Sequence, residues 1–142
     1  FVDGVQVQTN KDLDLVQSQH YVLGYDVRLA NKWRGKVEVY YQDISKAGVE
    51  SFPSSYSTLT EGADFGYSID KTSLVSNGTG FNQGIEFTVE KFFSEGYYGL
   101  FTTSLFESKY KGSDNVERNS PFNNGYVVNL LGGNEFKIGK ST

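Results

Sequence analysis

Three stretches of the chain alternate between apolar and polar positions. Over residues 20–29 the odd-numbered positions are apolar, and most of the even-numbered positions are polar. Residues 33–44 and 81–93 follow the same rule, with apolar side chains at most odd-numbered positions. A period of two is typical of a β-strand that has one apolar and one polar face. We therefore predict strands over residues 20–29, 33–44 and 81–93.

Two further stretches, 97–110 and 126–138, are rich in aromatic and β-branched residues, which favour strands. The faces of residues 97–110 follow from the turn that precedes them. Residues 94–96 end in glycine, which suits a type I turn followed by a left-handed residue. Such a three-residue turn pairs Phe93 with Tyr97, and the apolar face of the fourth strand is then again the odd-numbered one.

The same template fits residues 30–32, at the turn between the first two strands. It requires a left-handed residue at Lys32 and sets Asp26 opposite Lys36 on the polar face. A register shifted by two residues would oppose Asp26 to Glu38 instead, and like charges directly opposite each other are destabilising. We expect the first register.

The connections between the predicted strands are alternately short and long. Short turns join the strands at one end, whereas residues 45–80 and 111–125 form long loops at the other. Loops of this length are uncommon in a compact soluble domain but usual in outer-membrane barrels. Aromatic residues also gather near both strand ends, as two interfacial girdles require. The pattern predicts an all-β fold, an antiparallel meander of about five strands from an outer-membrane β-barrel, over residues 1–142.

An alternative fold is a soluble β-sandwich, a ligand- or carbohydrate-binding module in which the same apolar stripe packs a core. The opposite face favours the barrel, because it carries charges along the full length of the strands. A water-filled lumen accommodates such charges. The candidates for lumen-facing residues are Asp26, Arg28, Arg34, Lys36, Glu38, Glu86 and Glu90.

Composition excludes several classes of function. The 142 residues include 13 Lys and Arg against 17 Asp and Glu, for a net charge of -4, which argues against a nucleic-acid partner. Cysteine is absent from the sequence, which excludes a disulfide framework and thiolate chemistry. The sequence contains no methionine and opens without a signal-peptide pattern, so we expect a processed protein or an excised piece of one.

The residues do not suggest an enzyme. His20 is the only histidine, so a catalytic triad and a multi-histidine metal site are both disfavoured. Glu86 and Glu90 share a strand face at about 13 Å by the usual rise, too far apart for a retaining glycosidase pair. We expect a hydrated lumen wall at these residues, with no catalytic residue, no cofactor and no metal ion.

Several segments resemble the C-terminal half of the barrel in TonB-dependent outer-membrane receptors, in particular those with a carboxypeptidase-regulatory-like domain. The resemblance begins near Ser18 and covers nearly all of the chain that follows. The segments that carry it are His20-Tyr21-Val22-Leu23-Gly24-Tyr25-Asp26, Glu61-Gly62-Ala63-Asp64-Phe65-Gly66, Gly78-Thr79-Gly80-Phe81-Asn82-Gln83-Gly84-Ile85-Glu86, Glu90-Lys91-Phe92-Phe93 and Ser108-Lys109-Tyr110-Lys111-Gly112.

The resemblance implies a location and partners. Such receptors are barrels of about 22 strands closed by a plug, and they import scarce nutrients such as metal chelates or oligosaccharides. It implies the outer membrane of a Gram-negative bacterium, contact with its lipid, and a TonB complex that engages the plug of the parent protein. The sequence shows no plug, TonB box or aromatic C-terminal signal, so we expect a segment that is inactive alone. In water its apolar stripe is expected to pack against itself, within one folded-over chain or between copies.

Overall fold

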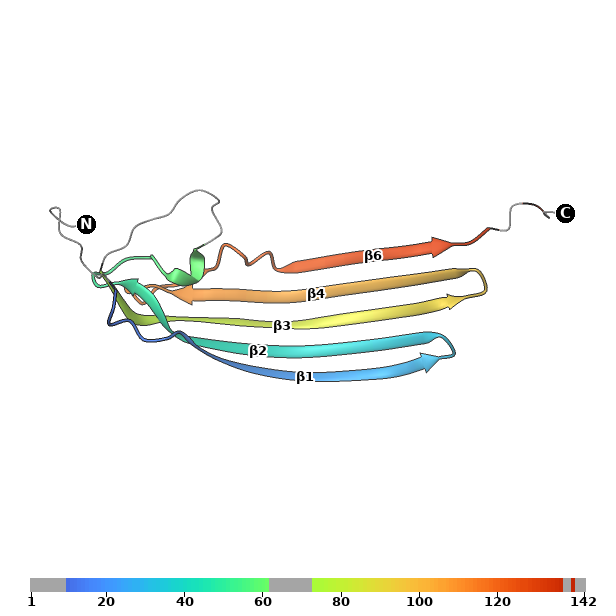
Figure 1. Ribbon diagram of the computed structural model, residues 1–142, viewed down its shortest axis with the longest axis horizontal. Coiled ribbons are helices and arrows are strands. Elements are labelled where there is room, and N and C mark those ends of the chain that lie inside the picture. Colours follow the sequence, from blue (N-terminus) through green and yellow to red (C-terminus); the bar gives the residue numbers. More distant parts are fainter. Residues whose placement is uncertain (1–9, 62–72, 137–138, 140–142) are drawn as a thin grey trace. The chain divides into compact units, whose positions relative to one another are not determined.

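The protein is described here by a computed structural model that covers residues 10–61, 73–136 and 139. It contains the strands β1 (Gln17–Ala30), β2 (Trp33–Glu50), β3 (Leu74–Ser94), β4 (Tyr97–Lys111), β5 (Glu117–Asn119) and β6 (Tyr126–Asn134), and a 3-10 helix η1 (Thr58–Thr60). The strands form one six-stranded sheet in the order β1-β2-β3-β4, with β5 and β6 both paired to β4 (Figure 1). The predicted all-β antiparallel meander is confirmed, as an open sheet.

The chain divides into two compact units. The first unit comprises residues 1–21, 41–83 and 107–124, and the second comprises residues 22–40, 84–106 and 125–142. The second unit therefore contains both short turns, whereas the first contains the connections that follow β2 and β4.

The loop predicted over residues 45–80 is shorter than expected. β2 extends to Glu50 and β3 begins at Leu74, so the connection covers residues 51–73. At the end of this longer hairpin the Ser51 amide donates to the Ser73 carbonyl at 3.2 Å. Lys46 lies inside β2 with φ 59°, a left-handed conformation that is typical of a β-bulge. Beyond a bulge, the odd-numbered and even-numbered residues exchange faces of the sheet. The alternation of apolar and polar residues therefore ends before β2 does, and the predicted strand was too short.

The second predicted long loop, over residues 111–125, is largely an interrupted strand along β4. β5 pairs with the end of β4, with Lys111 opposite Glu117, and β6 pairs with its beginning, with Leu105 opposite Tyr126. Between β5 and β6 the Phe106 amide donates to the Gly125 carbonyl at 2.9 Å. β5 has no apolar residue, and ion pairs such as Lys109 to Glu117 at 3.4 Å hold it in place.

β6 also differs from its predicted bounds, because it ends at Asn134 rather than at residue 138. Residues 135–136 follow it without strand structure, and residues 137–138 lie outside the described residues. β1 and β4 begin and end within a few residues of the predicted bounds.

The β3–β4 turn is of a different type from the one predicted. Both Glu95 and Gly96 have left-handed backbones, with φ 55° and 84°, which is the signature of a two-residue type I′ turn between Ser94 and Tyr97. The predicted three-residue turn is therefore wrong here. Further along the hairpin the odd-numbered residues of β3 and β4 nevertheless share one face, since the Gln83 side chain donates to the Glu107 carboxylate at 3.0 Å. In the β1–β2 turn, by contrast, Lys32 has φ 69° and is the left-handed residue that the template required.

Lys91 supports the β3–β4 hairpin from within. Its side chain is buried, at 5% exposure, and its ammonium donates to the carbonyls of Phe92 at 3.3 Å and Ser94 at 3.4 Å, and to the Ser94 hydroxyl. The same ammonium lies 4.2 Å from the centre of the Tyr97 ring. Hydrogen bonds and a cation–π contact thus compensate the buried charge.

We expect Glu95→Asn to stabilise the folded chain by about 1 kcal/mol, because asparagine tolerates the left-handed conformation better than glutamate and Asn-Gly is a preferred type I′ pair. Glu95→Val should have the opposite effect, since a β-branched residue is poorly suited to positive φ. Urea denaturation in detergent would measure both variants. If the two variants were equally stable, the left-handed backbone at Glu95 would be contradicted.

The packed core among the described residues is small. Ala47 and Val49 are its fully buried apolar side chains, and both belong to the first unit. Ser57, also fully buried, forms a bridge with Val49 and caps η1 by accepting from the Leu59 amide at 3.3 Å. In the described part of the second unit no apolar side chain is buried. The chain therefore does not fold its apolar stripe onto itself there, which was one of the two expected arrangements.

Candidate functional site

The second unit exposes many apolar side chains on one side of its sheet, which we call the apolar face. They occupy odd-numbered positions of β1 to β4, together with the β6 positions that pair with them, such as Tyr126 opposite Leu105. Each is at least 42% exposed: Leu23, Tyr25, Leu29, Val39, Ile85, Phe87, Leu105, Tyr126, Val128 and Leu130. Such a large exposed apolar surface normally contacts another protein or a membrane.

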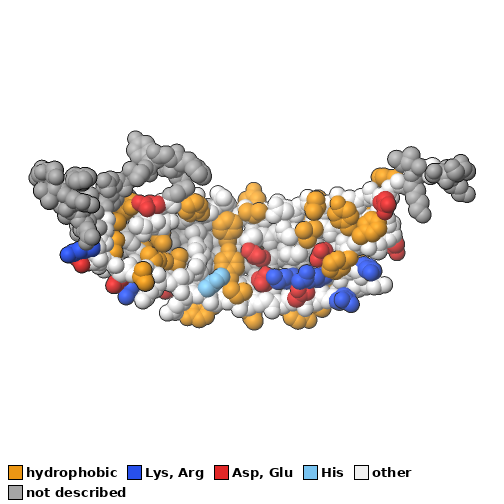
Figure 2. Space-filling view, viewed as in Figure 1, with side chains coloured by type: hydrophobic (Ala, Val, Ile, Leu, Met, Phe, Trp, Pro, Cys, Tyr) orange, Lys and Arg blue, Asp and Glu red, His pale blue; other side chains and the backbone are white. Residues whose placement is uncertain are grey.

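Charged side chains connect three strands on the other side of the sheet, which we call the polar face (Figure 2). Arg34 on β2 binds Asp26 on β1 in a bidentate pair, with Nε 3.0 Å from both carboxylate oxygens. Arg34 also lies 3.6 Å from Glu90 on β3. Lys36, the predicted partner of Asp26, pairs with Glu38 on its own strand. The planar guanidinium matches a carboxylate in a way that an ammonium cannot, which favours Arg34 as the partner.

The seven predicted candidates all lie on strands of the second unit, and five of them form these ion pairs. Arg28 and Glu86 are the exceptions, since neither has an ion-pair partner among the residues that the structure describes. Both side chains are exposed. Pattern analysis selected these seven positions, but it did not distinguish the two that are unpaired.

A hollow of about 480 Å³ lies beside Glu86 within the second unit. Its lining is mostly uncharged and able to form hydrogen bonds: Tyr40, Glu86, Phe87, Thr88, Thr102, Thr103, Ser104, Phe106, Val127 and Asn129. Sequence reasoning did not single out any of the hydroxyl or amide residues, because polar side chains on a polar face carry no distinctive pattern.

The position of Tyr40 depends on Gly84 in the neighbouring strand. A Cβ atom at Gly84 would lie 2.7 Å from the Tyr40 hydroxyl oxygen and 2.7 Å from the Leu105 carbonyl oxygen. The missing side chain therefore lets the Tyr40 ring lie across the β3 backbone and reach towards β4, an arrangement by which aromatics cover strand glycines. Ser104 on β4 lies beside the Tyr40 hydroxyl.

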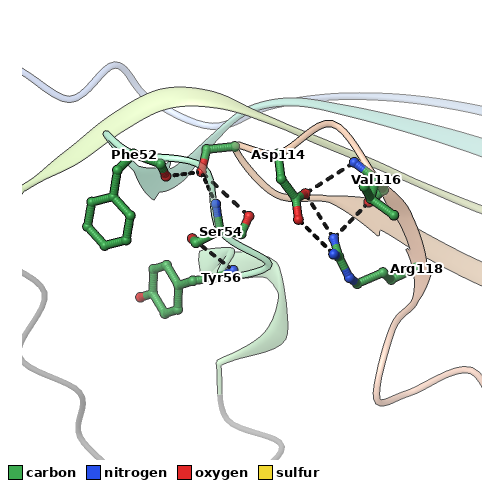
Figure 3. A network of polar contacts seen from close by, with 7 residues as sticks. Phe52, Ser54, Tyr56, Asp114, Val116 and Arg118 are labelled. Carbon is green, nitrogen blue, oxygen red and sulfur yellow. Dashed lines mark hydrogen bonds and ion pairs between the residues drawn. The ribbon is translucent and has the colours of Figure 1, made fainter.

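In the first unit, the loop after β2 is attached to the turn after β4 (Figure 3). The Ser113 hydroxyl donates to the Phe52 carbonyl at 2.6 Å and accepts from the Ser54 amide at 3.0 Å. The Asp114 amide donates to the Ser54 carbonyl at 3.3 Å. Residues 51–57 and 112–116 are thus joined by backbone and hydroxyl groups rather than by apolar packing.

Asp114 and Arg118 stabilise the shape of that turn. Two guanidinium nitrogens of Arg118 bind the Asp114 carboxylate at 2.9 and 2.7 Å, and Arg118 also donates to the Val116 carbonyl at 3.0 Å. The Arg118 hydrogen bond holds the pKa of Asp114 below its usual value. In the neighbouring loop, burial raises the pKa of Tyr56, as does its hydrogen bond with Glu61.

The described ranges contain no group of three or more side chains suited to holding a metal ion. No helix in those ranges is both long and apolar enough to cross a membrane. Comparisons with protein-family models, with curated proteins and with solved structures gave no match to this chain.

Proposed function

We propose that the chain forms part of the wall of an outer-membrane β-barrel receptor that imports a scarce nutrient. The observation that carries this proposal is the contrast between the two faces of the second unit: a broad, exposed apolar face lies opposite a polar face of ion pairs. Exposed apolar surface costs about 25 cal/mol per Å² in water. In a membrane barrel the same surface is stable, because lipid covers the outside and water fills the lumen.

Aromatic residues at the ends of the strands support a membrane position. Trp33 and Tyr97 open β2 and β4 beside the two short turns, with 37% and 39% of their surface exposed. In the first unit, Tyr41 and Phe81 stack with ring centres 6.2 Å apart. Aromatic side chains concentrate at both interfaces of membrane barrels.

The polar face fits a lumen wall. Its ion pairs remain partly exposed, with 44% of the Arg34 side chain and 46% of the Asp26 side chain accessible. Charged side chains of this kind carry a large free-energy cost when they face lipid, whereas they are common on surfaces that face water. We therefore assign the seven charged candidates to the lumen side.

The resemblance to TonB-dependent receptors supports the finer assignment. On this proposal the receptor lies in the outer membrane of a Gram-negative bacterium and contacts its lipid. A TonB complex acts on the plug of the parent protein, and the cargo is a small nutrient such as a metal chelate or an oligosaccharide. We assign the chain no catalytic activity, cofactor or nucleic-acid partner.

The open edges of the sheet require partner strands in this setting. Within the described residues β1 pairs with β2 alone, and β6 pairs with β4 alone. Backbone groups left unpaired in the hydrocarbon cost several kcal/mol each, so these edges pair with further strands of the barrel. When the chain is studied by itself, the same edges and the apolar face favour self-association.

Size-exclusion chromatography with and without detergent tests the proposal. We expect aggregation in plain buffer and a well-defined, β-rich species in detergent. Trp33 is the only tryptophan, so a blue shift of its emission in detergent would report that the β1–β2 hairpin has entered an apolar phase. A folded, monodisperse monomer in plain buffer, unchanged by detergent, would overturn the proposal and favour the soluble alternative.

A further inference from the structure

Glu86 is the one acidic side chain of the polar face that faces the hollow without a counter-charge. Asp26 and Glu90 bind Arg34, and Glu38 binds Lys36. No basic side chain belongs to the lining of the hollow, and the described part of the chain offers Glu86 no ion pair. The hollow therefore carries a net negative charge that the protein does not neutralise.

The smaller hollow in the first unit shows the opposite arrangement. It measures about 250 Å³, and its charged lining residues are Asp43, Lys109, Lys111 and Glu117. Lys109 lies 2.7 Å from Glu107 and 3.4 Å from Glu117, so its charge is already compensated. Acidic and basic side chains are thus equal in number in this hollow, whereas the lining of the hollow beside Glu86 contains one acid and no base.

The remaining polar groups around Glu86 are neutral and include several acceptors. Asn129 on β6 lies opposite Thr102 on β4, and its amide nitrogen donates to the Thr102 hydroxyl oxygen at 3.2 Å. That hydrogen bond directs the nitrogen towards Thr102 and leaves the Asn129 carbonyl oxygen as an acceptor. Thr88 and Ser104 add hydroxyl groups that accept or donate.

Tyr40 supplies an aromatic wall next to the carboxylate. Its ring lies across β3 at Gly84, and Tyr40 and Glu86 both line the hollow. An aromatic ring attracts cations through its electron-rich face, and it does so in addition to a nearby carboxylate. An anion would be repelled by this pair of groups, and a neutral ligand would leave the carboxylate without compensation.

We propose that this hollow binds an aliphatic primary ammonium group flanked by hydroxyls. Glu86 is the counter-ion, Tyr40 is the aromatic wall, and Thr88, Thr102, Ser104 and Asn129 accept or donate the remaining hydrogen bonds. The inference rests on the proposed function, since the hollow receives a ligand only if the polar face borders water. It adds a class of ligand group, a hydroxylated amine, to the nutrient-import role.

Titration of the detergent-folded chain with ethanolammonium, followed by NMR of the backbone amides, tests this inference. We expect saturable shifts at Thr102, Ser104 and Asn129. Glu86→Gln should weaken binding at least tenfold, because it removes the charge with little change in shape. Glu90→Gln is the matched control, since it removes a carboxylate of the same face that Arg34 already neutralises, and we expect less than a twofold change. Ethylene glycol and acetate serve as neutral and anionic probes, and neither should give saturable shifts.

The outcomes separate the two proposals. If the chain folds in detergent but Glu86→Gln binds ethanolammonium as tightly as the parent, or ethylene glycol binds equally well, the ammonium site is overturned while the barrel proposal stands. If the chain is instead a soluble monomer unaffected by detergent, the barrel proposal is overturned. The ammonium site is then overturned as well if the parent and Glu86→Gln bind ethanolammonium equally in plain buffer.

Discussion

Leu23→Arg is expected to lower the free energy of unfolding in phosphatidylcholine vesicles by about 2–4 kcal/mol, whereas the neighbouring substitution Val22→Arg should change it by less than about 1 kcal/mol. Leu23 belongs to the apolar face and Val22 to the polar face of the same strand, and they are 74% and 55% exposed. If the chain is part of a barrel wall, as proposed, arginine at Leu23 points into hydrocarbon, whereas arginine at Val22 points into a water-filled lumen.

A urea titration in vesicles, followed by the emission of Trp33 in the β1–β2 hairpin, measures both variants. The comparison is informative because both side chains are already exposed, so neither substitution removes core packing. A sheet that remained in water would tolerate both changes to the same degree. Equal losses of stability in the two variants would therefore contradict the proposal that the apolar face contacts the bilayer.

Gly112→Ala should destabilise the first unit by about 1–3 kcal/mol, the usual cost of overpacking. A Cβ atom there would overlap the Ser54 carbonyl oxygen and lie 3.0 Å from the carbonyl carbon of Ser55. These are backbone atoms that cannot rotate away, so the loop at residues 51–57 would have to move off the turn at 112–116. The contacts of Ser113 with Phe52 and Ser54 would then be lost.

Limited proteolysis should show faster cleavage within residues 51–57 of the Gly112→Ala variant. Urea denaturation should show unfolding at a lower midpoint concentration of urea. Gly99→Ala is the matched control, because the nearest atom to its Cβ would be the Leu131 carbonyl oxygen at 3.8 Å, an ordinary contact. Equal behaviour of the two alanine variants would contradict the docking of the loop on the turn.

Local sequence patterns predicted the strand content and the fold class. Over residues 20–29 and 81–93 each side chain is assigned to a face by its parity alone, because a strand has a period of two. The strand prediction failed where the local sequence departs from alternation or from strand-favouring residue types. Lys46 interrupts the alternation inside β2, and the charged segment of β5 has little strand preference of its own. Pairing with β4 makes that segment a strand, and such pairing depends on residues distant in the sequence.

The same division applies to the candidate site. The sequence by itself determined that seven charged residues share the polar face. The tertiary structure decided which of them pair, because the choice of Arg34 over Lys36 for Asp26 depends on register, twist and side-chain reach across strands. It also placed Tyr40 across Gly84 and left Glu86 beside a hollow without a partner among the described residues. Four strands contribute residues to that hollow, and contacts across four strands follow from the assembled sheet, not from the order of residues in any one of them.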